Sequence, residues 1–345
     1  MKVLVAMSGG VDSSVALFLL MRAGFGCAGA TMRLSGGETV ALNDARDAAS
    51  RLGAPHYVFD FSADFREKVI GPFADAYARG LTPNPCVECN RFLKFGRLLE
   101  QASEMGMDYL ATGHYARAGF DAASGRFWLK KAVDEAKDQS YMLYALTQEQ
   151  LRRVLFPLGE LTKARVREIA ADEGLAGAHV KESQDICFVP DGDYAGFIGR
   201  FTGRAFEGGD FIGEDGGVLG MHGGLIRYTV GQRKGLGAVF GRHMYVLAKD
   251  AGANTVTLGG EERLFSRTLK ADGFNWIACE APERPMKVKA KTRYRQPEQW
   301  ATVTATSPDA VLVEFDEPQR AIAPGQAVVL YDGDAVVGGG RILGM

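Results

Sequence analysis

Three cysteines in two polar segments are the residues of this chain best suited to chemistry. Cys86 and Cys89 lie in the segment 82–90, TPNPCVECN, and Cys187 lies in the segment 183–188, SQDICF. A thiolate is a strong nucleophile and a soft metal ligand. These residue types therefore favour either sulfur transfer or a metal cluster.

The spacing of the cysteines leaves these two kinds of chemistry open. A structural zinc site would need a fourth ligand, and the sequence has no second CxxC and no HxxxH. An iron–sulfur cluster held by three cysteines, with one open iron position, is the remaining metal alternative. Cys27 and Cys279 have small or apolar neighbours, so we expect them to be buried small side chains.

The two prolines before Cys86 disfavour helix, so we expect a helix to begin close to Cys89 and Asn90 and to run over 90–105. A helix N-terminus stabilises a thiolate, which predicts a lowered pKa for Cys89.

A second segment, 8–14 (SGGVDSS), has the composition of a phosphate-binding turn. It follows an apolar run over 3–7 and precedes a helical pattern that ends near Ala23. Backbone N–H groups and the helix dipole at such a turn favour an anion. The turn contains no lysine, so it is not a Walker loop. The pattern Ser-Gly-Gly-x-Asp-Ser is instead that of the PP-loop enzymes, which split ATP between the α- and β-phosphates.

The residues expected to bind ATP at this turn are Ala6, Met7, Ser8, Gly9, Gly10, Val11, Asp12 and Ser13. Asp12 either orients the turn or holds Mg²⁺ on the pyrophosphate, and the sequence does not distinguish these roles.

The elements around this turn predict an α/β fold. Strands expected over 27–32, 56–61 and 109–112 alternate with helices over 43–53 and 90–105. This alternation indicates a Rossmann-like parallel sheet with helices on both faces. Ligands of such sheets bind at the carboxyl ends of the strands, so we expect Met32 and Gly113 to contact the adenosine.

The alternation stops after about residue 193. Glycine pairs and short apolar runs over 244–248 and 254–258 follow, and short strands with turns recur past residue 264. The pattern predicts three domains: an ATP-binding catalytic domain over 1–193, a small central domain over 194–263 and a β-barrel over 264–345.

One stretch of the expected barrel is strongly basic. In the segment 287–295, KVKAKTRYR, every odd position carries a positive charge. A strand places alternate residues on one face, so the pattern predicts a stripe of five charges that could follow a phosphate backbone. A solvated barrel face is the alternative. Tyr294 would face the other way unless the strand bulges or ends there.

With the segments 111–117, 137–141, 228–237, 292–295 and 323–326, these motifs resemble the bacterial tRNA-specific 2-thiouridylase family along the whole chain. The resemblance implies that ATP, with Mg²⁺, adenylates the C2 oxygen of the wobble uridine. A persulfide sulfur then replaces this oxygen, and AMP leaves. It implies Cys187 as the persulfide carrier and Cys89 as the nucleophile that forms a disulfide with it.

The resemblance also implies partners and contacts. The partners are tRNAs of the Lys, Glu and Gln type and a protein that donates persulfide sulfur. The target base would be lined by Asn84, Pro85 and Cys86, and the tRNA would be contacted by His114, Lys137, Asp138, Gln139, Arg293, Tyr294 and Gln326.

Cys86 departs from much of this family, in which many members carry Asp. Here a thiol stands in its place. Cys86 could take over proton transfer, could pair with Cys187 in place of Cys89, or could join Cys89 and Cys187 as a cluster ligand.

The bulk composition is that of a globular protein. The 345 residues carry a net charge of −2, so nucleic-acid binding must depend on local basic patches. We find no apolar run long enough for a membrane span and no signal peptide, and we therefore expect a cytoplasmic location with reduced cysteines.

Overall fold

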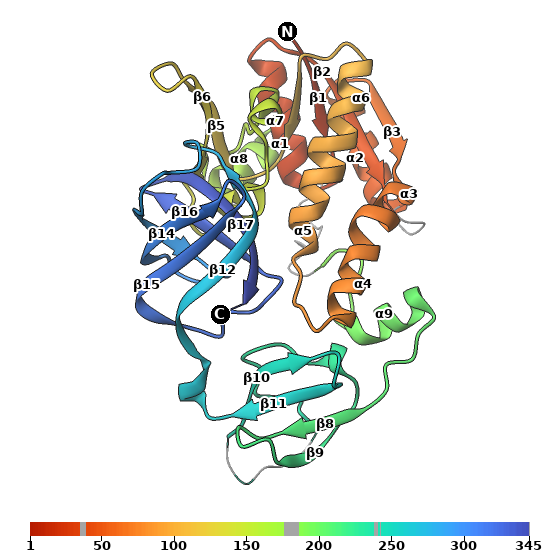
Figure 1. Cartoon of the computed structure of the whole chain (residues 1–345). Helices are drawn as coiled ribbons and strands as arrows, with labels where there is room; N and C mark the ends of the chain where they lie inside the picture. The colour runs from red at the N-terminus through yellow and green to blue at the C-terminus, as the bar shows by residue number, and fades with distance from the viewer. Residues whose placement is uncertain (35–38, 176–185, 238–240, 242, 345) are drawn as a thin grey trace.

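The N-terminal part of the chain is built on a parallel sheet, as predicted. The computed structural model describes residues 1–34, 39–175, 186–237, 241 and 243–344. Five strands pair in the order β3-β2-β1-β4-β7, with every pairing parallel (Figure 1). The strands are β1 (Lys2–Ala6), β2 (Gly26–Arg33), β3 (His56–Asp60), β4 (Tyr109–Thr112) and β7 (Val154–Leu155).

Helices cover both faces of this sheet. On β1, Val3 and Val5 pack on the face covered by α1 (Val11–Arg22), α2 (Thr39–Arg51) and α8 (Lys163–Asp172). Leu4 packs on the opposite face, against α3 (Ser62–Phe65), η2 (Cys89–Arg97) and α6 (Leu98–Glu104). Each such buried side chain contributes about 1.5–3 kcal/mol. Alternate strand residues thus bind helices from both sides, which holds the carboxyl ends of the strands in fixed positions.

Two helices begin earlier than expected. The helix predicted from residue 43 begins at Thr39. The helix predicted from residue 90 begins at Pro85, and α5 (Pro85–Glu88), η2 and α6 follow one another without a break, as the helical column in Figure 1 shows. Pro85 occupies the first turn, where a missing N–H costs nothing, and the side chain of Asn84 caps the helix. The expectation that the prolines keep the helix from starting before Cys89 is therefore wrong.

The middle of the chain forms a four-stranded sheet in the order β10-β11-β8-β9. This region packs against α4 (Gly71–Ala78), the helix that continues from η1 (Arg66–Ile70). In the contact, Ile226 of η4 lies in one buried cluster with Phe73 and Tyr77 of α4. Its elements are α9 (Tyr194–Thr202), β8 (Gly209–Ile212), β9 (Val218–His222), η4 (Leu225–Arg227), β10 (Tyr245–Asp250), β11 (Thr255–Gly259) and η5 (Glu261–Leu264).

The C-terminal strands form the predicted barrel. The order is β12-β15-β14-β13-β16-β17, and an additional pairing of β12 with β17 closes the ring. The strands are β12 (Phe265–Trp276), β13 (Met286–Lys291), β14 (Gln299–Ser307), β15 (Ala310–Arg320), β16 (Ala327–Asp332) and β17 (Ala335–Gly344). A hairpin from the N-terminal part, β5 (Ala116–Asp121) and β6 (Arg126–Lys131), extends this sheet through pairing of Lys130 with Ala335. The two parts of the chain therefore share one sheet.

The basic stripe is shorter than predicted. On β13, Lys287, Lys289 and Lys291 alternate with the buried Val288 and Ala290, as a strand requires. The strand ends at Lys291, and the chain then turns, so the arginines at 293 and 295 leave this face. The prediction of five aligned charges is wrong because the strand is too short to align them. None of the helices in the described part of the chain combines the length and apolar character needed to cross a bilayer.

Candidate active site

The PP-loop lies where the strand order reverses. From β1, the chain adds β2 and β3 on one side and β4 and β7 on the other. The segment Ser8–Gly10 follows β1 at its carboxyl end and leads directly into α1. A crevice outside the carboxyl ends at such a switch point is where open α/β sheets bind ligands.

The loop is folded for close approach of an anion. Gly9 has a φ of 79°, and a side chain there would collide with the backbone of Ala41 in α2. Ser13 Oγ accepts a hydrogen bond from Ser8 N at 3.2 Å and donates one to Gly10 O at 3.0 Å. The first-turn amides of α1 have no acceptor within the helix. This backbone cradle fits the phosphates of ATP.

Asp12 is held by two residues that the sequence did not single out. Lys163 Nζ lies 2.8 Å from both carboxylate oxygens, and the Tyr115 hydroxyl donates to Asp12 Oδ1 at 2.8 Å. Only 10% of the Lys163 side chain is exposed. These contacts favour the loop-orienting role of Asp12, since both carboxylate oxygens already accept from protein donors. No local pattern links Lys163 to the PP-loop.

Gly113 and Met32 border the same end of the sheet. A Cβ on Gly113 would lie 2.9 Å from Asp12 C and Ser13 N, so β4 packs directly on the start of α1. Met32 is half-buried near the end of β2, where the neighbouring Thr31 hydroxyl donates to Met7 O at 2.9 Å. Both residues lie where the sequence predicted contact with adenosine.

The two thiols of the cysteine helix differ in exposure. Cys89 is only 9% exposed, whereas Cys86 reaches solvent at one edge although protein surrounds most of its thiol. Burial raises the pKa of both thiols, and the positive charge of Lys94 opposes this in part. The predicted thiolate stabilisation at Cys89 is therefore wrong. Cys89 lies a full turn inside the helix, beyond the strong field of its N-terminus.

Lys94 connects the thiols to the sheet. Its charge acts on Cys86, on Cys89 and on His114, the residue after Gly113. His114 is 8% exposed, shares a 2.7 Å hydrogen bond with Thr112 Oγ1 and packs on Phe95. Burial lowers its pKa well below the usual value, so the imidazole is neutral. The charge of Lys94 thus lowers the pKa of both cysteines and of the residue beside the PP-loop.

Cys187 is exposed, and its neighbour Phe188 anchors it. The Phe188 ring packs edge-on against Phe65 at 5.5 Å and against Phe73 at 5.2 Å. Phe188 also packs against the core cluster that contains Cys89. The remainder of the Cys187 motif, 183–185, lies outside the described residues.

The cysteines do not form a metal-binding group in this conformation. Within the described ranges, no three His, Cys, Asp or Glu side chains are close enough to hold a metal ion. The arrangement of Cys86, Cys89 and Cys187 therefore does not favour a cluster. Cys27 and Cys279 are half-buried in apolar surroundings, close to expectation.

The segment 137–139 is linked to the PP-loop through Tyr115. The buried Asp138 carboxylate accepts from Ala132 N, from Ser140 N and from the Ser140 hydroxyl. Gln139 makes two hydrogen bonds with the backbone of Tyr115. Its side chain accepts from Tyr115 N, and its own N–H donates to Tyr115 O. Lys137 is half-buried. Tyr115 in turn donates to Asp12, so this segment is linked to the ATP loop.

Of the barrel residues suggested for tRNA contact, Gln326 reaches the segment just before the cysteine helix, whereas Tyr294 and Arg293 donate to other segments. The Tyr294 hydroxyl donates to Asp138 O at 2.9 Å, and burial, with smaller contributions from Asp138 and Cys86, raises the pKa of Tyr294. Gln326 Nε2 donates to Thr82 O at 2.9 Å, just before the helix. Arg293 donates to Val230 O at 3.0 Å and to Ala321 O at 2.9 Å. The end of β13 thus lets Arg293 and Tyr294 point toward different neighbours.

The start of the cysteine helix is fixed by polar contacts with one methionine. Asn84 Nδ2 donates to Met142 Sδ at 3.2 Å, and Asn90 Nδ2 donates to Met142 O at 3.0 Å. Pro85 is buried between them. The three residues expected to line a target base, 84–86, thus form a rigid first turn.

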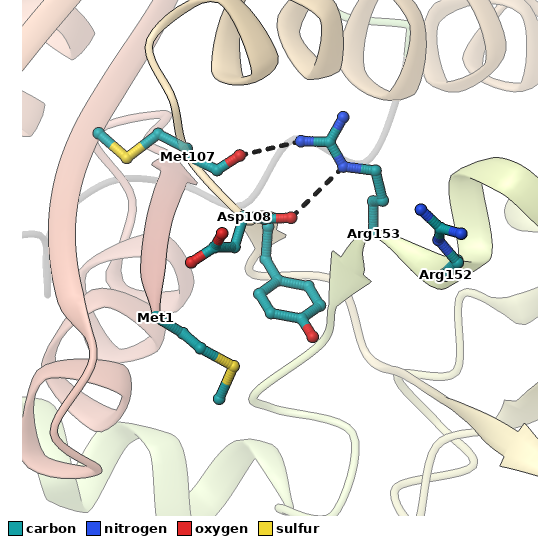
Figure 2. A pocket seen from close by; sticks show the side chains of 6 residues that line it. Met1, Met107, Asp108, Arg152 and Arg153 are labelled. Carbon is teal, nitrogen blue, oxygen red and sulfur yellow. Dashed lines mark hydrogen bonds between the residues drawn. The ribbon is translucent and has the colours of Figure 1, made fainter.

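A separate hollow of about 430 Å³ lies at the opposite end of the sheet. Figure 2 shows Arg153 there, donating to Met107 O at 2.9 Å and to Asp108 O at 3.4 Å. Met1 and Tyr109 mark the amino ends of β1 and β4. This hollow lies at the amino ends of the strands, whereas a nucleotide is expected at their carboxyl ends. The Arg153 guanidinium already donates to the backbone carbonyls of Met107 and Asp108.

Three family models match successive parts of the chain. The first, tRNA methyl transferase HUP domain, matches residues 1–191. The second, tRNA methyl transferase PRC-barrel domain, matches residues 196–260. The third, aminomethyltransferase beta-barrel domain, matches residues 266–342.

Curated relatives match nearly the whole chain. The tRNA-specific 2-thiouridylase MnmA of Acetivibrio thermocellus is 48% identical over 354 residues, which cover 99% of each chain. The protein of the same name from Clostridioides difficile is 46% identical over 352 residues, covering 99% of this chain and 98% of the relative. Among solved structures, the U34-tRNA thiolase NcsA from Methanococcus maripaludis has a TM-score of 0.37 at 17% identity, covering 55% of this chain and 62% of that one. That likeness is too weak for any statement about the present chain.

The family descriptions name methyl transferases, whereas the full-length relatives are named thiouridylases. The geometry agrees with the relatives, because a PP-loop at the switch point and a cysteine helix beside it suit ATP and sulfur. The chain belongs to the tRNA-specific 2-thiouridylase family.

Proposed function

We propose that this protein is an ATP-dependent sulfurtransferase that 2-thiolates the wobble uridine of tRNA. One observation supports this most directly. The ATP cradle and the cysteine helix are neighbours, because Gly113 packs on the PP-loop while the next residue, His114, packs on Phe95 of the cysteine helix at 5.8 Å between ring centres. A base activated by ATP at one side would meet a thiol at the other.

The first step is adenylation. The C2 oxygen of the uridine attacks the α-phosphorus of ATP, the bond to the β-phosphate breaks, and pyrophosphate leaves. The PP-loop amides and the α1 dipole stabilise the negative charge that develops on the phosphates. Mg²⁺ bound with the ATP phosphates would neutralise part of the same charge. AMP is then a far better leaving group than the carbonyl oxygen.

The second step transfers sulfur. The terminal sulfur of a Cys187 persulfide attacks C2, and AMP leaves with the original oxygen. The Cys89 thiolate then attacks Cys187 Sγ, which releases the thiolated base and leaves a disulfide between the two cysteines. A thiol reductant restores both thiols. Burial raises the pKa of Cys89, so its thiolate forms less readily than that of an exposed cysteine.

Cys86 is the more exposed thiol of the cysteine helix, and we assign it proton transfer at the target base. Asn84 and Pro85 line the same base. Contacts to the rest of the tRNA come from His114, Lys137, Asp138, Gln139, Arg293 and Tyr294. Gln326 acts on the tRNA only indirectly, because its side-chain amide already donates to Thr82 O. For Asp138 the contact is indirect, because its carboxylate is already occupied by internal donors.

The wider setting follows from this activity. The substrates are tRNAs of the Lys, Glu and Gln type, the sulfur comes from a persulfide donor protein, and the enzyme works in the cytoplasm, where these tRNAs are. The chain divides into catalytic (1–193), central (194–263) and barrel (264–345) units.

The test is thiolation of an unmodified tRNA transcript with ATP and a persulfide source. Cys187→Ser and Cys89→Ser should each abolish thiolation, while Cys86→Ser and Cys86→Asp should keep part of it. Full activity in Cys89→Ser would overturn the assignment of the nucleophile. If thiolation required iron, and an iron-dependent absorbance disappeared in all three serine variants, the mechanism would be a cluster mechanism instead.

A further inference from the structure

We propose that the barrel turn 323–326 is a positioning device for the cysteine helix. In this proposal, Gly325 and Gln326 grip Thr82 and thereby set where Cys86 and Cys89 stand relative to the adenylated base. The inference rests on the proposed function and adds to it two positioning residues that act through the backbone of the ATP-binding part of the chain.

The grip uses both backbone groups of Thr82. Thr82 N donates to Pro324 O at 2.8 Å, and Gln326 Nε2 donates to Thr82 O at 2.9 Å. The turn itself is tied to the last barrel strand, because Gly325 N donates to Ile342 O and Ile342 N donates to Gln326 O, each at 2.8 Å. The barrel therefore holds Thr82 at two points, as a strand partner would.

Gly325 makes this approach sterically feasible. Its φ of 91° is in the left-handed region, and a Cβ there would lie 2.9 Å from Thr82 N and 3.0 Å from Leu81 Cβ. The nearest obstacle is backbone, which cannot rotate out of the way as a flexible side chain could. Any residue other than glycine would push the barrel turn and the segment at 82 apart.

The segment between Thr82 and the thiols transmits such a displacement. Pro83 and Pro85 restrict the backbone, and Asn84 caps the helix through Cys86 N. In Figure 1 this segment is the loop that joins α4 to α5 at the lower end of the helical column. At the far side, Asn84 and Asn90 are bound to Met142. The helix start is thus held between Met142 and the barrel turn.

The consequence for catalysis concerns the second step. Adenylation takes its phosphate contacts from the PP-loop, whereas sulfur transfer needs C2 of the base within reach of the Cys187 persulfide and of Cys89. A misplacement of about 1 Å at a reacting group can cost about a hundredfold in rate. Because residues 84–86 line the base, a shift of the helix start moves C2 of the adenylated uridine away from the Cys187 persulfide. The adenylated uridine then waits longer, and water attacks C2 instead, releasing AMP and regenerating uridine. The signature of a lost grip is AMP formed without thiolated tRNA.

The experiment compares two glycine variants in the full-length enzyme. Gly325→Ala should raise the ratio of AMP released to uridine thiolated by about tenfold or more. Gly333→Ala is the matched control, because Gly333 also has a positive φ of 58° in the barrel but has open space within 4 Å of the point where a Cβ would stand. This control should leave the ratio unchanged.

Gln326→Leu provides a second measurement in case Gly325→Ala does not fold. As a positioning residue, Gln326 should be dispensable for tRNA affinity, so the Kd for tRNA should stay within about twofold while the AMP ratio rises. A weakened Kd with an unchanged ratio would show instead that Gln326 is a tRNA ligand and would overturn the proposal. Equal losses of AMP and of thiolated product in Gly325→Ala would overturn it too. Failure of the wild-type enzyme to thiolate tRNA would contradict the proposed function itself.

Discussion

Lys163 Nζ lies 2.8 Å from both carboxylate oxygens of Asp12, so the lysine that the PP-loop lacks in sequence is supplied from the start of a distant helix. The Tyr115 hydroxyl completes the contact. A carboxylate in the first turn of α1 would otherwise repel the phosphates of ATP. Lys163 balances that charge and holds the side chain aside.

This relationship predicts a defect in nucleotide use for Lys163→Met. We expect kcat/KM for ATP, measured as tRNA-dependent AMP formation, to fall about a hundredfold, the scale seen when a fixed donor at a charged site is removed. Lys163→Arg should recover part of the loss, since it keeps the charge. A double variant with Asp12→Asn should lose less than the sum of the single variants. An unchanged KM and kcat in Lys163→Met would exclude this role.

The charge of Lys94 predicts a pH effect on the thiols. Burial raises the pKa of Cys86 and Cys89, and Lys94 lowers both in part. The rate of thiol alkylation should therefore keep rising with pH through the alkaline range, because the reactive thiolate forms late. Lys94→Met should move this rise to still higher pH. The exposed Lys270→Met is a control variant that should leave the profile in place, and a Lys94→Met profile identical to wild type would contradict the prediction.

The short basic face of β13 predicts a modest contribution to tRNA binding. Lys289 lies 5.4 Å from the ring centre of Trp300, which is 51% exposed on the neighbouring strand. Lys289→Ala should weaken tRNA binding and reduce the slope of log Kd against log salt by about 1. Trp300→Ala should weaken binding without changing that slope, because stacking carries no charge. Measurement of Kd at several salt concentrations separates the two effects, and equal slopes for Lys289→Ala and wild type would place the RNA elsewhere.

Lys249 predicts how stability depends on pH. Desolvation lowers its pKa from 10.5 to about 8. Between these values the unfolded chain holds the proton and the folded protein does not, so the free energy of unfolding should rise as the pH increases from about 8 to about 10.5. Below about pH 8 both states hold the proton, so the folded protein carries the full desolvation cost of the charged Lys249.

Chemical denaturation across this pH range tests the effect. Lys249→Met should remove the rise, although it also removes the 2.7 Å hydrogen bond to Tyr228 O. Lys270→Met should keep the rise. The buried Cys86 and Cys89 have raised pKa values and oppose this rise, so the effect is measured as the difference in stability between wild type and Lys249→Met. A difference that does not grow over the interval would show that Lys249 is charged in the folded protein.

Local patterns in the sequence were enough to predict the α/β domain, the barrel and the PP-loop part of the site. The apolar run, the glycine turn and Asp12 predict a strand, a phosphate cradle and a helix because each signal extends over a few adjacent residues. The same holds for the barrel, whose strands follow from short alternating runs. Met32 and Gly113 could be placed because parallel strands all end at one edge.

Only the tertiary structure decided which distant residues meet. Lys163 reaches Asp12, Gln326 reaches Thr82, and Phe95 packs on His114, yet no periodicity relates these positions along the chain. The pKa of Cys89 likewise depends on burial by packed neighbours, which a motif does not contain. Sequence signals report short-range backbone preference, whereas the electrostatics and reach of a site depend on contacts that form only when remote segments pack.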